Sequence, residues 1–238
     1  MFLWVVLDLD YMNHIILAGD SVFDNRRWVK DGEPDVRDQL ADLLDDGDKA
    51  TLIAVDGDMN NNVLKQLDNI PNDATHLFIS IGGNDALMHI DSFTDSVNTI
   101  GEALDSFNEM VQEFERDYIK MLTNVIKYGL KTTLCTIYNP CFDHDNMDRI
   151  SYMIPLNANL KELQRRSTTA LPLFNNIIFQ EAFNFGLPVM DLRLIFNDKA
   201  DYSNPIEPSV VGGMKMARII KEISYNHDFS RKNSVVYK

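Results

Sequence analysis

Apolar residues follow two different spacings along the chain. Short apolar runs rich in β-branched residues predict five strands, at 14–18, 51–55, 77–81, 132–138 and 187–190. Between these runs, apolar residues recur at steps of three and four, which is the spacing of amphipathic helices. Regular alternation of strand and helix is typical of a parallel sheet covered by helices on both faces. The pattern therefore predicts an α/β fold.

The helical spacing is clearest in four segments. We expect helices at 35–46, 92–128, 157–184 and 209–224. The second of these is either one long helix or two in tandem with a break near Gly101. Ser209 is the expected N-cap of the last helix, because a serine hydroxyl can accept a hydrogen bond from an N–H of the first turn.

The pattern also sets the expected domain limits. No linker, repeat or low-complexity tract interrupts residues 12–226, which we interpret as one domain. Because the first strand begins only near His14, residues 1–11 are a possible N-terminal extension. The polar segment 227–238 is expected to be a loose tail.

Composition narrows the possible partners. The 238 residues hold 22 Lys and Arg against 36 Asp and Glu, a formal net charge of −14. Such a surface repels nucleic acid and anionic membranes but leaves neutral or cationic ligands open. Cys135 and Cys141 lack metal-ligand spacing, and the apolar start of the chain lacks the basic flank of a signal peptide. We expect a cytoplasmic protein without cofactor or metal; its oligomeric state stays open.

Small polar clusters follow three of the predicted strands. Gly19-Asp20-Ser21 comes after the first strand, Gly57 lies in the turn after the second, and Gly82-Gly83-Asn84-Asp85 comes after the third. The carboxyl ends of parallel strands share one edge of the sheet, which is where α/β folds build their sites. A hydroxyl, a backbone N–H and an amide side chain at that edge are what acyl transfer through a tetrahedral oxyanion requires.

With these clusters the chain resembles the SGNH hydrolases, also called GDSL esterases and lipases. Ser21 matches the nucleophile block, with Val22 in place of the usual leucine; Gly57 matches the second block and Asn84 the third. The resemblance implies a three-layer α/β/α sandwich of flavodoxin-like type with a five-stranded parallel sheet. It also implies an oxyanion hole made by the Ser21 N–H, the Gly57 N–H and the Asn84 side chain.

The fourth block of the family departs from its pattern in this chain. The family carries Asp-x-x-His before the last helix, whereas this chain has Asn204 at the aspartate position and Glu207 at the histidine position. Glutamate can accept a serine proton only if its surroundings raise its pKa toward the working pH. Glu207, oriented by Asn204, is therefore the expected proton acceptor; a purely structural role at the helix entrance stays open.

Other side chains are candidates for the pocket. Asp20, Asp85 and His144 are expected to contact the substrate, and His144 is also the preferred histidine if an imidazole replaces the missing base, ahead of His89. His14 and His76 begin strands at the opposite edge and are expected to be structural. The apolar residues expected to line the pocket are Met88, Tyr138, Phe142, Met147 and Tyr152.

We interpret the sequence as a serine-dependent hydrolase of small esters or acylated metabolites or sugars. Two alternatives stay open. The altered fourth block favours a protein that keeps the oxyanion donors, binds an acyl or sugar group and has lost turnover. The acidic residues at the strand ends would suit a metal-dependent phosphoesterase, although the chain lacks the histidine motifs that such enzymes use.

Overall fold

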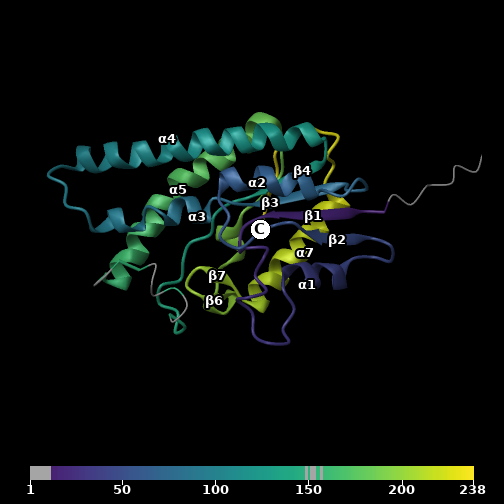
Figure 1. The fold of residues 1–238 in the computed structure, drawn as a ribbon, viewed down its shortest axis with the longest axis horizontal. Coiled ribbons are helices and arrows are strands. Elements are labelled where there is room, and N and C mark those ends of the chain that lie inside the picture. Colours follow the sequence, from purple (N-terminus) through teal and green to yellow (C-terminus); the bar gives the residue numbers. More distant parts are fainter. Residues whose placement is uncertain (1–11, 148–149, 151–153, 156–157) are drawn as a thin grey trace, which may run out of the picture.

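The computed structural model describes residues 12–147, 150, 154–155 and 158–238, and the possible extension 1–11 lies outside them. A six-stranded sheet in the order β2-β1-β3-β4-β5-β8 forms the centre of the molecule (Figure 1). All its strand pairs are parallel. Its strands are β1 (His14–Gly19), β2 (Lys49–Leu52), β3 (His76–Ser80), β4 (Lys131–Cys135), β5 (Val189–Met190) and β8 (Val236–Tyr237). The predicted α/β class with a parallel sheet is confirmed.

Helices cover both faces of this sheet. One face packs against α2 (Asn60–Gln66), α4 (Ile100–Val125) and α5 (Leu160–Phe185), and the other against α1 (Val36–Leu43), α6 (Leu192–Ile195) and α7 (Val210–Asn226). Figure 1 shows α4 and α5 on one side of the strands and α1 and α7 on the other.

The side chains of β1 point alternately to the two faces of the sheet, and both faces are covered by helices. Ile16 and Ala18 belong to the core under α4 and α5, whereas Ile15 and Leu17 belong to the core under α1 and α7. Successive side chains of a strand point to opposite faces, so a strand buried on both faces has no polar side. This is why the strands are continuous apolar runs in the sequence.

The segment expected to be helical from 92 to 128 is divided. Its first residues belong to the 3₁₀ helix η2 (Ile90–Thr94), which follows the short α3 (Gly83–Leu87). The helix α4 begins only at Ile100, with the Thr99 side chain accepting the N–H of Glu102. A threonine cap fixes the start because it satisfies an N–H that has no partner within the helix. Ser209 caps α7 as predicted, accepting from the N–H groups of Val211 and Gly212.

The C-terminal segment is not the loose tail that its polar composition suggested. Val236 and Tyr237 form β8, paired in parallel with β5. The N–H groups of Val189 and Asp191 donate to carbonyl groups of this segment, at 2.8 and 2.9 Å. The sheet therefore has six strands instead of five. Within the part of the chain that the structure describes, no helix has the length and apolar character of a membrane span.

Candidate active site

Ser21 lies directly beyond the carboxyl end of β1. Gly19 ends the strand with φ of +128°, and a Cβ there would lie 1.8 Å from the carbonyl oxygen of Ser80. Glycine is therefore required for β1 and β3 to approach at this point. The Asp20 N–H donates to the same Ser80 carbonyl at 3.0 Å, which fixes the turn that presents the buried Ser21.

Gln66, which sequence reasoning missed, holds the end of β1 from the side. Its amide oxygen accepts the N–H of Gly19 at 2.8 Å, and its NH₂ donates to the Gly19 carbonyl at 2.7 Å and to a carboxylate oxygen of Asp58 at 2.7 Å. The buried Gln66 amide thus joins the end of β1 to the turn that follows β2. A glutamine among the apolar positions of α2 is the one sequence signal that could have pointed to it.

Glu207 meets Ser21 across 186 positions of sequence. It lies on the antiparallel hairpin of β6 (Tyr202–Asn204) and β7 (Glu207–Pro208), just before α7. The Ser21 hydroxyl donates to Glu207 Oε1 at 3.2 Å, and among the described residues Glu207 Oε2 is buried without a hydrogen-bond partner. Burial raises the pKa of Glu207 well above its ordinary value because it disfavours the charged form, and the nearby Asp20 adds to the rise by disfavouring a second negative charge.

Asn204 acts on Glu207 through the backbone and not on its carboxylate. The Asn204 side-chain oxygen accepts the N–H groups of Ile206 and Glu207 at 3.0 and 3.1 Å. This closes the tight turn of the β6–β7 hairpin, as asparagine side chains commonly do. The expectation that Asn204 orients the base is therefore corrected: it fixes the position of the Glu207 main chain, and no hydrogen bond joins the two side chains.

A hydrogen bond joins the segment that carries Asn84 to the turn that carries Gly57. Asn84 lies in the first turn of α3, and its Nδ2 donates to the backbone carbonyl of Asp58, next to Gly57, at 2.9 Å. An asparagine amide has two N–H donors, so one stays available. Gly57 has φ of +90° with no atom within 4 Å of where a Cβ would be. Neither the Gly57 N–H nor the Ser21 N–H is bonded within the described residues.

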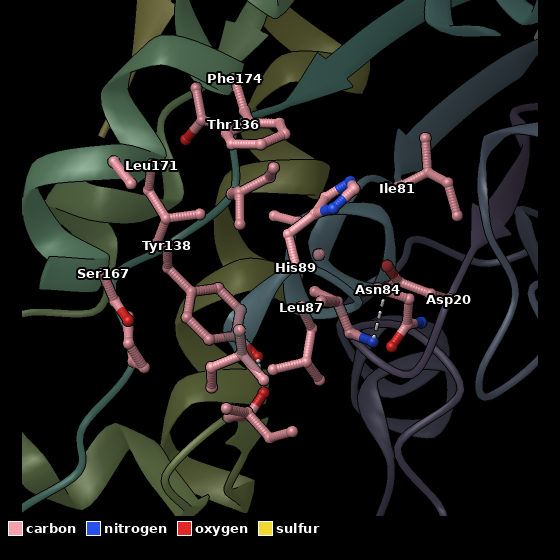
Figure 2. A pocket seen from close by; sticks show the side chains of 18 of the residues that line it. Asp20, Ile81, Asn84, Leu87, His89, Thr136, Tyr138, Ser167, Leu171 and Phe174 are labelled. Atoms are coloured by element: carbon pink, nitrogen blue, oxygen red, sulfur yellow. Dashed lines mark hydrogen bonds between the residues drawn. The ribbon is translucent and has the colours of Figure 1, made fainter. Parts of the chain in front are cut away.

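Ser21 and Glu207 open into a cavity of about 110 Å³. Residues after β1, β3 and β4, from α3 and η2, and from the facing sides of α4 and α5 line it. Figure 2 shows Asp20 and Asn84 at one side of the cavity, and Ser167, Leu171 and Phe174 of α5 at the other. Gly57 does not line this cavity; it is exposed, on the turn between β2 and α2.

Of the two acidic residues expected to contact the substrate, Asp20 and Asp85, only Asp20 lines the cavity. Asp20 lines the cavity, and burial raises its pKa to about 7. Asp85 does not line it: its carboxylate accepts the N–H of Asn60, at the start of α2, and burial raises its pKa to about 6. The expected substrate contact through Asp85 is therefore corrected to a role in helix capping, which a carboxylate near a helix N-terminus commonly has.

The expectation that His144 contacts the substrate, and is preferred over His89 as a base, is also corrected. His144 does not line the cavity, and its Nε2 and Nδ1 atoms bond to the Tyr202 carbonyl and the Asn146 N–H, both at 3.1 Å. His89 does line the cavity, between Asn84 and α5, and its ring makes no hydrogen bond within the described residues (Figure 2). The tight turn after α3 brings His89 back over the site, which its spacing of five residues from Asn84 did not reveal.

Tyr138 is the aromatic residue that most clearly shapes the wall near Glu207. Its ring stacks on Phe196 with centroids 4.5 Å apart, and its hydroxyl donates to the carbonyl of Ile206, next to Glu207. Phe142 lines the cavity too, whereas Met88 is exposed and Met147 packs in a satellite core. Tyr152 lies outside the described residues.

The other acidic side chains at the strand ends bind neighbouring protein groups: Asp56 pairs with Arg27 at 3.5 Å and Asp58 accepts from the Gln66 amide at 2.7 Å. Asp24 accepts the N–H of Asp56 at 2.9 Å. Within the described part of the chain, no three His, Cys, Asp or Glu side chains gather as metal ligands would. The residues that the metal-dependent alternative would need are thus occupied with local structure.

Comparison with known proteins agrees with this geometry. The sequence matches the GDSL-like lipase/acylhydrolase family over residues 15–219. The chain therefore belongs to the GDSL family, whose members are hydrolases. None of the curated proteins matches the sequence.

Solved structures share the fold at low sequence identity. An extracellular lipase from Streptomyces rimosus is 14% identical with a TM-score of 0.60, over 89% of this chain and 99% of that one. A phospholipase A1 from Streptomyces albidoflavus is 16% identical with a TM-score of 0.61, over 90% and 99%. An acetyl xylan esterase is 15% identical with a TM-score of 0.59, over 88% and 98%.

Proposed function

We propose that this chain is a serine-dependent ester hydrolase in which Ser21 is the nucleophile and Glu207 replaces histidine as the proton acceptor. The observation that carries the proposal is the hydrogen bond of 3.2 Å from the Ser21 hydroxyl to Glu207 Oε1 at the wall of a cavity. Its substrates would be small esters or acylated metabolites or sugars. Lipase and esterase neighbours of the same fold are consistent with this chemistry.

The proposed reaction has two halves. Ser21 Oγ attacks the carbonyl carbon while its proton passes to the ionised Glu207, and the negative charge on the carbonyl oxygen is held by the Ser21 N–H and the Asn84 amide, whose residues both line the cavity. Glu207 then returns the proton to the departing alcohol oxygen, leaving Ser21 acylated. A water molecule attacks the acyl group by the same route, and Glu207 returns that proton to Ser21 Oγ.

The raised pKa of Glu207 decides when this reaction can run. A general base works best when its pKa is close to the working pH, so burial makes this carboxylate a stronger base than an ordinary glutamate. Only its ionised form accepts a proton, and at low pH the group is neutral. The activity is therefore expected to rise with pH as Glu207 ionises.

The raised pKa of Glu207 also favours a second candidate function, which is binding of an acyl group without turnover. A neutral Glu207 cannot remove the Ser21 proton, and the cavity and free N–H groups would then bind an acyl group without turnover. The two candidates differ in whether Ser21 becomes acylated.

A fluorophosphonate probe, which phosphonylates activated serines, distinguishes them. We expect labelling that rises with pH, is absent in Ser21→Ala, and is slowed about 10²- to 10⁴-fold in Glu207→Gln, the range for loss of a general base. The His89→Ala variant should keep the same pH profile. If His89→Ala instead removes the labelling and Glu207→Gln does not, the base is the imidazole. No labelling of the wild type at any pH would select the binding protein.

A further inference from the structure

Glu207 lies on a hairpin that is not part of the central sheet. β6 and β7 form a two-stranded sheet of their own, and Figure 1 shows them apart from the strands of the main sheet. Ser21, in contrast, directly follows β1 and is fixed by the sheet. The distance of 3.2 Å from Ser21 Oγ to Glu207 Oε1 therefore depends on what holds the hairpin in place.

The turn of this hairpin is bound by the segment that follows β4. Pro205 and Ile206 are the two residues between β6 and β7. The Cys141 N–H donates to the Pro205 carbonyl at 2.8 Å, and the Tyr138 hydroxyl donates to the Ile206 carbonyl. Tyr138 thus binds the turn at its end next to Glu207.

The ring of Tyr138 is packed on two sides. It is buried, stacks on Phe196 with centroids 4.5 Å apart, and meets the edge of Tyr202 at 5.7 Å. A closely packed ring leaves its hydroxyl little freedom to move. The position of the hydroxyl therefore sets the position of the carbonyl that it binds.

Two amide side chains of α5 hold the segment that follows β4. Asn175 Oδ1 accepts the Ile137 N–H at 2.7 Å, and its Nδ2 donates to the Ile137 carbonyl at 2.8 Å. Gln164 makes the same kinds of bond, accepting the Phe142 N–H at 2.8 Å and donating to the Pro140 carbonyl at 2.7 Å. An amide side chain carries an acceptor and a donor, as a peptide group does, so these two replace a neighbouring strand where β4 has ended.

We propose that Tyr138 is a positioning residue for the reaction, whose hydroxyl fixes the turn before Glu207 so that the carboxylate lies beside Ser21; this rests on the proposed function. Gln164 and Asn175 support it by fixing the segment that carries Tyr138 to α5. A base must lie within hydrogen-bond reach of the proton that it accepts, and a displacement of about 1 Å can slow the step about 10²-fold.

Tyr138→Phe removes the hydroxyl and keeps the ring. We expect fluorophosphonate labelling and kcat for p-nitrophenyl acetate to fall at least about tenfold, with KM changed less than about twofold, because the base moves and the pocket stays. Tyr225→Phe is the matched control, since the Tyr225 hydroxyl bonds to Asp48 at the opposite edge of the sheet, where β2 begins. Equal labelling rates in Tyr138→Phe and the wild type would overturn the proposal.

The pH profile separates positioning from a simple loss of stability. Burial holds the pKa of Glu207 above its ordinary value, and a looser hairpin lets water reach the carboxylate. The midpoint of labelling in Tyr138→Phe should therefore move to lower pH, by about half a pH unit or more. Asp20 and Asp56, the charged groups that act on Glu207, are unchanged in this variant. A smaller amplitude with an unshifted midpoint would show a purely structural role.

Gln164→Leu tests the support behind Tyr138. Two backbone groups of the segment lose their partners, so slower labelling and a shift of the midpoint in the same direction are expected. The effects of Gln164→Leu and Tyr138→Phe should not multiply in the double variant, because both act through the position of Glu207. Gln180→Leu is the control, exposed on the same helix. Effects that multiply would overturn the role of Gln164.

A measurement that needs no reaction separates this proposal from the proposed function. Carbon-13 NMR of the glutamate carboxyl groups, with Glu207 assigned by Glu207→Gln, gives the ionisation midpoint of Glu207 directly. If the wild type never reacts with the fluorophosphonate but Tyr138→Phe lowers this midpoint, the hydrolase function fails and the placement of Glu207 by Tyr138 stands. If the wild type reacts and Tyr138→Phe changes neither rate nor midpoint, the placement fails and the hydrolase stands.

Discussion

Gln66 shows how one side chain can position a whole site. It satisfies both the N–H and the carbonyl of Gly19, the residue before Asp20-Ser21, and also reaches Asp58. At this point β2 has ended, and although the Val55 N–H still donates to the Gly19 carbonyl at 3.1 Å, the Gly19 N–H is bonded by Gln66 instead of a strand. A buried amide that replaces a strand neighbour in this way leaves a backbone N–H unpaired if it is removed.

We therefore expect Gln66→Leu to lower the free energy of unfolding by about 1–3 kcal/mol, since the buried Gly19 N–H loses its partner while the Gly19 carbonyl keeps the Val55 N–H. Denaturant unfolding measures the change. Gln112→Leu is the control because Gln112 is exposed on α4, and it should change stability by less than about 0.5 kcal/mol. Equal effects of the two substitutions would show that Gln66 has no special role.

Among the secondary-structure elements, the two-residue strand β8 is expected to contribute more to stability than its length suggests. β8 covers the edge of β5, and the Ser234 hydroxyl donates to the Ala182 carbonyl at the end of α5 at 2.9 Å. Tyr237 also bonds through its hydroxyl to His227 Nδ1, at 2.9 Å, which ties the end of the chain to the end of α7. An exposed edge of a parallel sheet is a site for unwanted pairing, so covering it affects solubility as well as stability.

Removal of residues 232–238 should lower the free energy of unfolding by about 2 kcal/mol, because two backbone hydrogen bonds to β5 and the side-chain contacts of this segment are lost. Thermal denaturation measures the loss, and light scattering follows the aggregation expected from the exposed β5 edge. Removal of Lys238 alone is the control. An unchanged melting temperature in the longer truncation would contradict the role of β8.

At the scale of the whole molecule, buried titratable groups make the stability depend on pH. Burial raises the pKa of Asp20 from 3.8 to about 7 and that of Asp85 to about 6. Between the unfolded and folded pKa values the unfolded chain binds fewer protons, so stability falls as pH rises through that window. His76 acts oppositely: burial lowers its pKa to about 4, so its contribution is lost as pH falls from 6.5 to 4.

We therefore expect the free energy of unfolding to be about 1 kcal/mol lower at pH 8 than at pH 6, because the ionisation of Asp20 and Asp85 outweighs the opposite effect of His76. Asp20→Asn keeps an oxygen that can accept the Val22 N–H and removes the charge, so it should reduce this difference. Denaturant unfolding at the two pH values measures it, with Asp46→Asn on the surface as control. A wild-type protein equally stable at both values would contradict the expectation.

The sequence by itself determined the α/β class, the five main strands, the cap at Ser209 and the positions of the three blocks that carry Ser21, Gly57 and Asn84. These follow from local periodicity and turn chemistry, which act between residues close along the chain. The resemblance of the fourth block also led to the expectation that Glu207 lies beside Ser21. Only the tertiary structure decided that β8 joins the sheet, that Gln66 holds the end of β1, and that His89, not His144, faces the cavity. Such contacts depend on packing between segments far apart in sequence, and no local pattern records them.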